Sequence, residues 1–170
     1  MREEPGKERV LLSIWFENAL HGIAIGQFGL MLETDDGGKT WRERKIVDDP
    51  DQAEKHLMQI FAGANGLVFV TAESGSIFRS EDAGRTWKAI QTDNKGSFWA
   101  GLALKDGSIL AAGMRGHVYR STDRALTWRE VPGLRRSRSA WISAADISMP
   151  GGQPSTSCLL YTSPSPRDGL

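Results

Sequence analysis

One residue pattern recurs three times along this chain of 170 residues, each time at the end of a longer block of similar sequence. The blocks at residues 11–41, 57–87 and 98–128 align without a gap. Each closes with a Ser or Thr, an Asp two residues later and a Thr-Trp pair. Self-similarity at a regular period is typical of a repeat architecture. The sequence therefore predicts three copies of one structural unit.

Each block also carries a glycine at the same position between two apolar runs, as Gly29, Gly75 and Gly116. Glycine at a tight turn accommodates a positive φ angle that other residues adopt with difficulty. Each block then predicts a strand, a turn, a strand, the glycine turn, a strand, an Asp-rich turn and a last strand that begins at the Trp. This order predicts a four-stranded antiparallel meander, and hence an all-β fold.

The Asp-rich turn, or Asp-box, has a local physical reason. A hydroxyl and a carboxylate at this spacing hydrogen-bond within a hairpin loop, and the indole that follows packs under the loop. The third copy has Ala125 where Gly38 and Gly84 stand, so we expect its loop to be more strained or to open differently. We interpret the residues of the three Asp-boxes as structural. They are Thr34, Asp36, Gly38, Thr40, Trp41, Ser80, Asp82, Gly84, Thr86, Trp87, Ser121, Asp123, Thr127 and Trp128.

The spacing of Trp41, Trp87 and Trp128 matches the period of about 40–50 residues for one four-stranded blade of a β-propeller. We expect a partial β-propeller with three blades at about residues 10–46, 56–92 and 97–132. A further blade is expected to start at residues 139–147, because Ser139-Ala140-Trp141 repeats Ser97-Phe98-Trp99.

The end of the chain breaks this register. Residues 158–170 resemble one reading frame of a transposon-end adapter used in sequencing libraries, read through at the end of an insert. We expect these residues not to be native, which leaves residues 1–157 as an incomplete propeller of a longer protein. The single cysteine, Cys158, lies in this tail, so cysteine usage carries no information about the redox compartment.

The net charge of the chain is zero, but the charges are unevenly distributed. Residues 1–56 carry a net charge of −4 and residues 98–157 a net charge of +4. This asymmetry predicts an acidic partner, although solvated blade edges would produce it as well. Nucleic acid is not expected, because the run of arginines lacks an interleaved aromatic platform. The candidate partner-binding basic patch consists of Arg115, Arg120, Arg124, Arg135, Arg136 and Arg138.

Residues 22–41, which end in Asp35-Asp36-Gly37-Gly38-Lys39-Thr40-Trp41, resemble the repeat of the photosystem II stability/assembly factor-like proteins, within the wider group of Asp-box (BNR) repeats. The resemblance covers roughly residues 10–147. It implies a propeller of about seven blades and a non-catalytic scaffold that binds a protein partner in the assembly or maintenance of a membrane complex. It also implies an extracytoplasmic location, in the periplasm or the thylakoid lumen. Many relatives come from bacteria that have no photosystem.

A glycan-active or glycan-binding propeller remains the alternative, because sialidases and some other glycosidases share Asp-boxes. Sialidases use a Tyr nucleophile and an Arg cluster, and other glycosidases use paired carboxylates. Tyr119 is the one tyrosine before the tail, and its position in the block is that of a strand residue that packs in the blade. The Asp-box acids Asp36, Asp82 and Asp123 are turn formers on separate blades. We therefore expect no catalytic residues in this chain.

No cofactor or metal is expected. The three histidines, His21, His56 and His117, lie far apart and have no partner at ligand spacing, which favours surface or turn positions. The Asp35-Asp36-Gly37 run lacks the alternating acids and the later Glu of a calcium loop.

No direct insertion into a membrane is expected either. The apolar stretch after Val10 is interrupted by Glu17, Asn18 and His21, so it is neither a signal-peptide core nor a membrane span. If the full-length protein is exported, we expect its signal upstream of Met1.

Overall fold

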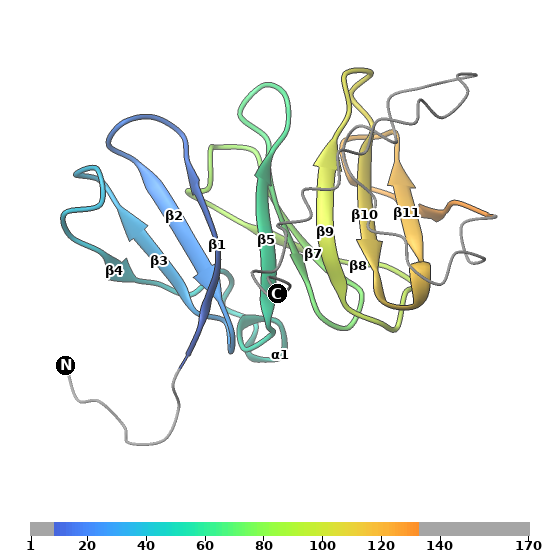
Figure 1. Ribbon diagram of the computed structural model, residues 1–170, viewed down its shortest axis with the longest axis horizontal. Coiled ribbons are helices and arrows are strands. Elements are labelled where there is room, and N and C mark those ends of the chain that lie inside the picture. The colour runs from blue at the N-terminus through green and yellow to red at the C-terminus, as the bar shows by residue number, and fades with distance from the viewer. Residues whose placement is uncertain (1–8, 133–170) are drawn as a thin grey trace, which may run out of the picture.

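Three four-stranded antiparallel sheets make up the structure, a computed structural model that describes residues 9–132 (Figure 1). The first blade contains β1 (Leu11–Phe16), β2 (Gly22–Gly26), β3 (Met31–Thr34) and β4 (Arg42–Glu43). The second contains β5 (Leu57–Ala62), β6 (Val68–Ala72), β7 (Ser76–Ser80) and β8 (Lys88–Gln91). The third contains β9 (Phe98–Ala103), β10 (Ile109–Gly113), β11 (Val118–Ser121) and β12 (Arg129–Glu130).

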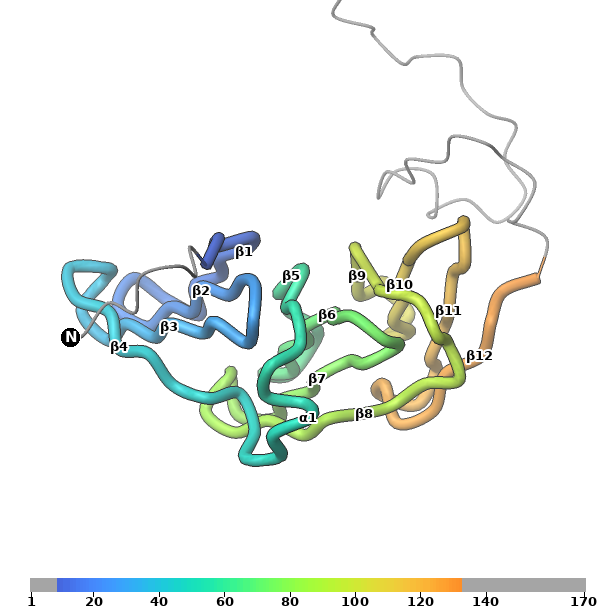
Figure 2. Tube along the Cα trace, turned by 90° about the horizontal axis from the view of Figure 1, so that it is seen from below, coloured from blue at the N-terminus to red at the C-terminus, as the bar shows by residue number. Residues whose placement is uncertain are grey.

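Within each sheet the strands follow one another in chain order, so each blade is a meander, as the repeat predicted. The blades stand side by side in an arc, with β1, β5 and β9 on its inner side and β4, β8 and β12 on its outer side (Figure 2). The predicted all-β partial propeller is therefore confirmed. The predicted start of a further blade at residues 139–147 and the tail at 158–170 lie outside the described residues.

The buried apolar side chains gather between the blades. One cluster joins the first and second blades through residues such as Ile23, Met31, Val70 and Phe78. Two smaller clusters join the second and third blades, one around Phe69 and the other around Ile77, Phe98 and Tyr119. Each blade is thus stabilised mainly by the apolar faces of its neighbours, as is typical of stacked repeats.

The predicted glycine turns are present in all three blades, where Gly29, Gly75 and Gly116 have φ angles of 65°, 71° and 73°. The residue before each glycine also has a positive φ angle, and two such residues in succession form the type I′ hairpin turn that suits the twist of antiparallel strands. The first two turns are tied to the segment leading to the next blade. The Gly29 amide donates to the Lys55 carbonyl at 3.0 Å, and the Gly75 amide donates to the Gly96 carbonyl at 2.8 Å.

Equivalent faces of successive blades differ in exposure. In the second blade Ile60, Val70 and Phe78 pair across three strands and are buried against the first blade. The matching residues of the first blade include Ile14, which is 59% exposed, whereas Ile60 is 4% exposed. Within the described residues, this apolar face is therefore exposed in the first blade, whereas the equivalent face of the second blade is buried.

Helices are minor elements of residues 9–132. α1 (Pro50–Ala53) lies between the first two blades, and the short 3-10 helix η1 (Met114–Gly116) forms the glycine turn of the third. Neither has the length and the apolar run that crossing a membrane requires.

Candidate partner-binding site

The Asp-box of the second blade shows how these loops are built. The Ser80 hydroxyl donates to one Asp82 carboxylate oxygen at 2.7 Å, and the Gly84 amide donates to the Ser80 hydroxyl at 2.8 Å. The amide and hydroxyl of Thr86 donate to the same carboxylate at 2.8 and 2.6 Å. One carboxylate thus connects the end of β7 with the start of β8.

The other two loops repeat this pattern with Asp36 and Asp123. The Thr40 and Thr127 hydroxyls, followed by the amides of the same residues, lower the pKa of these carboxyls to about 2. Burial raises the pKa of Asp82, but the Thr86 and Ser80 hydrogen bonds outweigh it and bring the pKa to about 2 as well. All three acids are therefore ionised and hydrogen-bonded at neutral pH, which suits turn formation rather than proton transfer.

The third loop keeps this geometry although Ala125 replaces a glycine. The Ala125 amide donates to the Ser121 hydroxyl at 2.9 Å, as Gly84 does to Ser80, so the expectation of a differently opened loop is wrong. The expected strain is present, because Ala125 and Arg124 have φ angles of 66° and 60°. The Ala125 side chain is fully buried against the second blade.

The tryptophans that follow the boxes differ in one respect. The indole nitrogens of Trp41 and Trp128 donate to loop carbonyls of Gly38 and Ala125 at 3.1 and 3.2 Å, which ties each loop to its strand. The Trp87 indole nitrogen is buried and has no hydrogen-bond partner among the described residues. The second loop therefore depends more on apolar packing of its indole.

Alanine substitutions at the loop glycines are expected to separate strain from steric conflict. Gly38 and Gly84 have φ angles of 87° and 89°, so an alanine at either position is strained. A methyl group at Gly84 would also lie 2.3 Å from Ile23 Cδ1, whereas at Gly38 its nearest contact is 3.6 Å away. We expect Gly84→Ala to lower the free energy of unfolding by about 1–2 kcal/mol more than Gly38→Ala. Urea denaturation measures the difference, and equal losses would contradict the steric argument.

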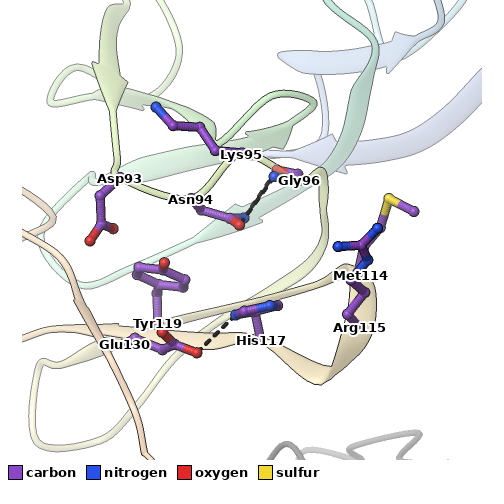
Figure 3. Close-up of a pocket in the computed structure, with 9 residues that line it drawn as sticks. All are labelled: Asp93, Asn94, Lys95, Gly96, Met114, Arg115, His117, Tyr119 and Glu130. Atoms are coloured by element: carbon purple, nitrogen blue, oxygen red, sulfur yellow. Dashed lines mark hydrogen bonds and ion pairs between the residues drawn. The ribbon is translucent and has the colours of Figure 1, made fainter.

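The described part of the chain contains a pocket of about 510 Å³ in the third blade (Figure 3). One side is the segment between β8 and β9, and the other is the turn between β10 and β11 together with residues of β11 and β12. The pocket is lined by Asp93, Asn94, Lys95, Gly96, Met114, Arg115, His117, Tyr119 and Glu130. The pocket therefore lies between the third blade and the linker that precedes it.

Local hydrogen bonds hold the first wall of the pocket in place. The Asn94 side chain is buried, donates to the Gly96 carbonyl at 3.0 Å and accepts from the Gly96 amide at 3.1 Å. The Thr92 hydroxyl donates to the Gly75 carbonyl at 2.9 Å, which ties this segment to the glycine turn of the second blade. This wall is therefore preorganised.

The second wall carries ionisable and aromatic side chains. His117 Nδ1 lies 2.8 Å from a Glu130 carboxylate oxygen, and Tyr119 packs edge-to-face on Phe98 with ring centroids 5.4 Å apart. Tyr119 is 4% exposed, so it packs in the blade as its repeat position predicted. Figure 3 shows Arg115 beside Met114 on the far side of the pocket from Tyr119. The pocket thus combines the cations Lys95 and Arg115 with an apolar neighbour.

The structure does not bring together the three candidate arginines that it describes, Arg115, Arg120 and Arg124. Arg115 lies in the turn between β10 and β11, whereas Arg124 lies in the Asp-box loop at the opposite end of β11. Arg120 pairs with Asp106 at 2.8 Å, and Arg124 lies 3.7 Å from Glu81. Arg135, Arg136 and Arg138 lie outside the described residues. Of the candidates that the structure describes, Arg115 alone lines the pocket.

Asn94 and Lys95 were missed by the sequence interpretation. Their signal is the polar run Thr92-Asp93-Asn94-Lys95-Gly96, which has the composition of a turn and links two blades. Residues 9–132 hold no group of three His, Cys, Asp or Glu side chains placed for a metal ion. His21 is buried rather than on the surface, with Nδ1 3.0 Å from an Asp35 carboxylate oxygen.

A family model described as the photosynthesis system II assembly factor YCF48 matches residues 4–133, which include every described residue. The chain belongs to this family. A photosystem II assembly lipoprotein Ycf48 from Synechococcus sp. (strain CC9902) is 33% identical over 85 residues, which are 49% of this chain and 25% of the relative. A second Ycf48 lipoprotein, from Synechococcus sp. (strain RCC307), is 42% identical over 55 residues, which are 32% of this chain and 16% of the relative.

Solved structures of YCF48 proteins are similar as well. The structure of YCF48 bound to D1 peptide superimposes with a TM-score of 0.62 at 28% identity, covering 72% of this chain and 40% of that chain. YCF48 from Cyanidioschyzon merolae gives a TM-score of 0.58 at 25% identity, covering 75% and 38%. The chain therefore corresponds to less than half the length of each of these YCF48 relatives.

Proposed function

We propose that this protein is a non-catalytic scaffold that binds a polypeptide partner during assembly or maintenance of a membrane complex. Its membership of the YCF48 family supports the proposal, and so does the D1 peptide bound to one structurally similar YCF48 protein. The pocket in the third blade connects the proposal to particular residues, because Lys95 lies on its preorganised wall and Arg115 lies on the opposite wall.

The charges of the pocket favour a discrete acidic group over an extended anionic surface. Arg115 and Lys95 provide donors for a carboxylate, and Arg in particular forms paired hydrogen bonds with one. Asp93 and Glu130 line the same pocket and would repel a continuous negative surface. An acidic side chain or the C-terminal carboxylate of a peptide can accept hydrogen bonds from these cations without placing a continuous negative surface against Asp93 and Glu130.

Charge reversal at Arg115 is expected to weaken binding of a synthetic D1 peptide by about tenfold. Fluorescence anisotropy of the labelled peptide at low salt measures the effect, and added salt should reduce the affinity of the wild-type chain. Arg124→Glu is the matched control, because Arg124 lies on the same blade at the opposite end of β11. Equal binding by wild type and Arg115→Glu would exclude this pocket, and no binding by the wild-type chain would contradict the proposed function.

We also propose an extracytoplasmic location, on the basis that both Synechococcus relatives are named lipoproteins. An ancestral GH74 enzyme is similar in fold, with a TM-score of 0.58 at 14% identity, and this similarity concerns the fold alone. The pocket has one arginine among its nine lining residues, so the described residues favour peptide binding over an arginine cluster for a sugar carboxylate.

A further inference from the structure

Each inner strand contains a β-bulge at the same repeat position. In β1, Leu11 pairs with Gly26 and Ser13 with Ile25, so Leu12 has no partner across the strand pair. Met58 in β5 and Trp99 in β9 are unopposed in the same way, since the flanking pairs are consecutive on β6 and β10. A bulge takes a side chain out of the regular alternation and redirects it. We call Leu12, Met58 and Trp99 the bulge row.

The bulge row is apolar and largely open to solvent. Leu12 is 45% exposed and Trp99 is 57% exposed, while Met58 is half-buried. By contrast, Leu57 and Phe98, the residues directly before Met58 and Trp99, are fully buried in the clusters between the blades. In the second and third inner strands, the residue before the bulge is buried in a core cluster and the bulge residue is more exposed, so the bulge row is distinct from the core.

The row leads to the pocket at the third blade. Met114, which lines the pocket and is 48% exposed, donates its amide to the Ser97 carbonyl at 3.1 Å, two residues before Trp99. Arg115 follows Met114 directly. Exposed Trp, Met and Arg side chains are the types enriched in protein interfaces, where Trp and Arg often contribute most of the binding energy.

The shape of the row favours an extended chain as its occupant. β1, β5 and β9 stand next to one another along the inner side of the arc, so the bulge row crosses three blades in sequence (Figure 2). A segment that crosses these three strands in order passes one residue of the bulge row per blade and then reaches Met114 and Arg115 in the turn between β10 and β11. A flat membrane surface would have to enter the concave side of the arc to make the same contacts.

We propose that the bulge row is a docking strip for an apolar stretch of an extended polypeptide, whose neighbouring acidic group lies against Arg115 and Lys95. The inference rests on the proposed function, because it specifies which side chains of the polypeptide partner contact the propeller. Trp99 is the main anchor, because it has the largest side chain of the row and lies nearest the charged pocket.

Binding of a labelled D1 peptide to Trp99 variants of the whole chain tests the strip. We expect Trp99→Ala to weaken binding about tenfold and Trp99→Leu to retain most of the affinity, because leucine keeps an apolar contact. Leu126→Ala is the matched control, since Leu126 is 62% exposed and lies in the Asp-box loop of the same blade. Thermal melting should leave Trp99→Ala close to wild type, which excludes misfolding as the cause of weaker binding.

The outcomes separate the strip from the pocket. Wild-type affinity in Trp99→Ala together with weak binding in Arg115→Glu would overturn the docking strip and leave the proposed function standing. No binding by the wild-type chain would overturn both. Trp99→Ala could instead reduce sedimentation with phosphatidylcholine and phosphatidylglycerol vesicles and leave peptide binding unchanged. That result would assign the bulge row to a lipid surface and overturn the proposal that a polypeptide occupies it. Serine replacements of the peptide's apolar residues should weaken binding to wild type but not to Trp99→Ala.

Discussion

Phe78→Ala is expected to lower the free energy of unfolding by about 3–5 kcal/mol, the range for a buried phenylalanine whose removal leaves a cavity. The Phe78 side chain is 0% exposed and packs in the cluster that joins the first and second blades. Neighbouring side chains come from two separate sheets, so they cannot close the cavity without shifting a whole blade. Urea denaturation followed by far-UV circular dichroism measures the loss.

Leu32→Ala is the matched control for Phe78→Ala. Leu32 occupies the same repeat position in the first blade, on the face where Ile14 is largely exposed. We expect a loss of about 1 kcal/mol at Leu32, because its contacts are incomplete in the described structure. Equal losses at both positions, with a midpoint that rises with protein concentration, would show that the open face is covered by self-association in solution.

Much of the fold could be predicted from the sequence because each repeat encodes its own turns. Gly29, Gly75 and Gly116 mark the type I′ turns, and the Asp-box residues mark the loops that end the third strand of each blade. These signals are local: hydroxyl, carboxylate and glycine act within a few residues of one another. Local signals repeated at one period were sufficient to predict three meanders and their order.

The candidate site was harder to predict because one of its walls is the linker between two blades and the other belongs to the third blade. Arg115 and Arg124 are close in sequence, but β11 lies between them and holds them at opposite ends of the blade. Lys95 is far from Arg115 in sequence, yet both line the pocket because the segment after β8 passes the turn after β10. Contacts between a linker and a repeat are not visible in a repeat alignment, which compares equivalent positions only.

Two smaller features, the bulges and helix α1, could not be predicted from the repeat. The bulges depend on strand register, which a gapless alignment of the blocks leaves undetermined. Helix α1 lies in the linker between the first two blades, whereas the linker between the second and third blades has no helix. The signal for α1 is Asp49 followed by Pro50. The Asp49 carboxylate accepts from the Asp51 amide at 3.0 Å, which is the usual N-cap arrangement before a proline at the first helical position.

Acid is expected to weaken this propeller through its Asp-boxes, and Asp82 provides the sharpest test. At neutral pH, Asp82→Ala should lower the free energy of unfolding by about 2 kcal/mol, because the buried Ser80 hydroxyl and the Thr86 amide lose their shared acceptor. Asp93→Ala is the control, since Asp93 is an exposed acid in the segment after β8. Urea midpoints of the three proteins between about pH 2 and pH 6 give the comparison.

The direction of the pH effect follows from the pKa of the Asp82 carboxyl, which is about 2 in the folded chain against an ordinary value of 3.8. A carboxyl whose pKa is lowered by folding stabilises the folded state above its ordinary pKa, and this contribution disappears as the pH falls towards the folded value. The gap between wild type and Asp82→Ala should therefore be full above about pH 5 and shrink towards pH 2. Asp36 and Asp123 have the same lowered pKa, so the variant should keep a reduced acid sensitivity of its own. A gap independent of pH would mean that the Asp82 side chain stabilises the loop by packing rather than as a hydrogen-bonded carboxylate.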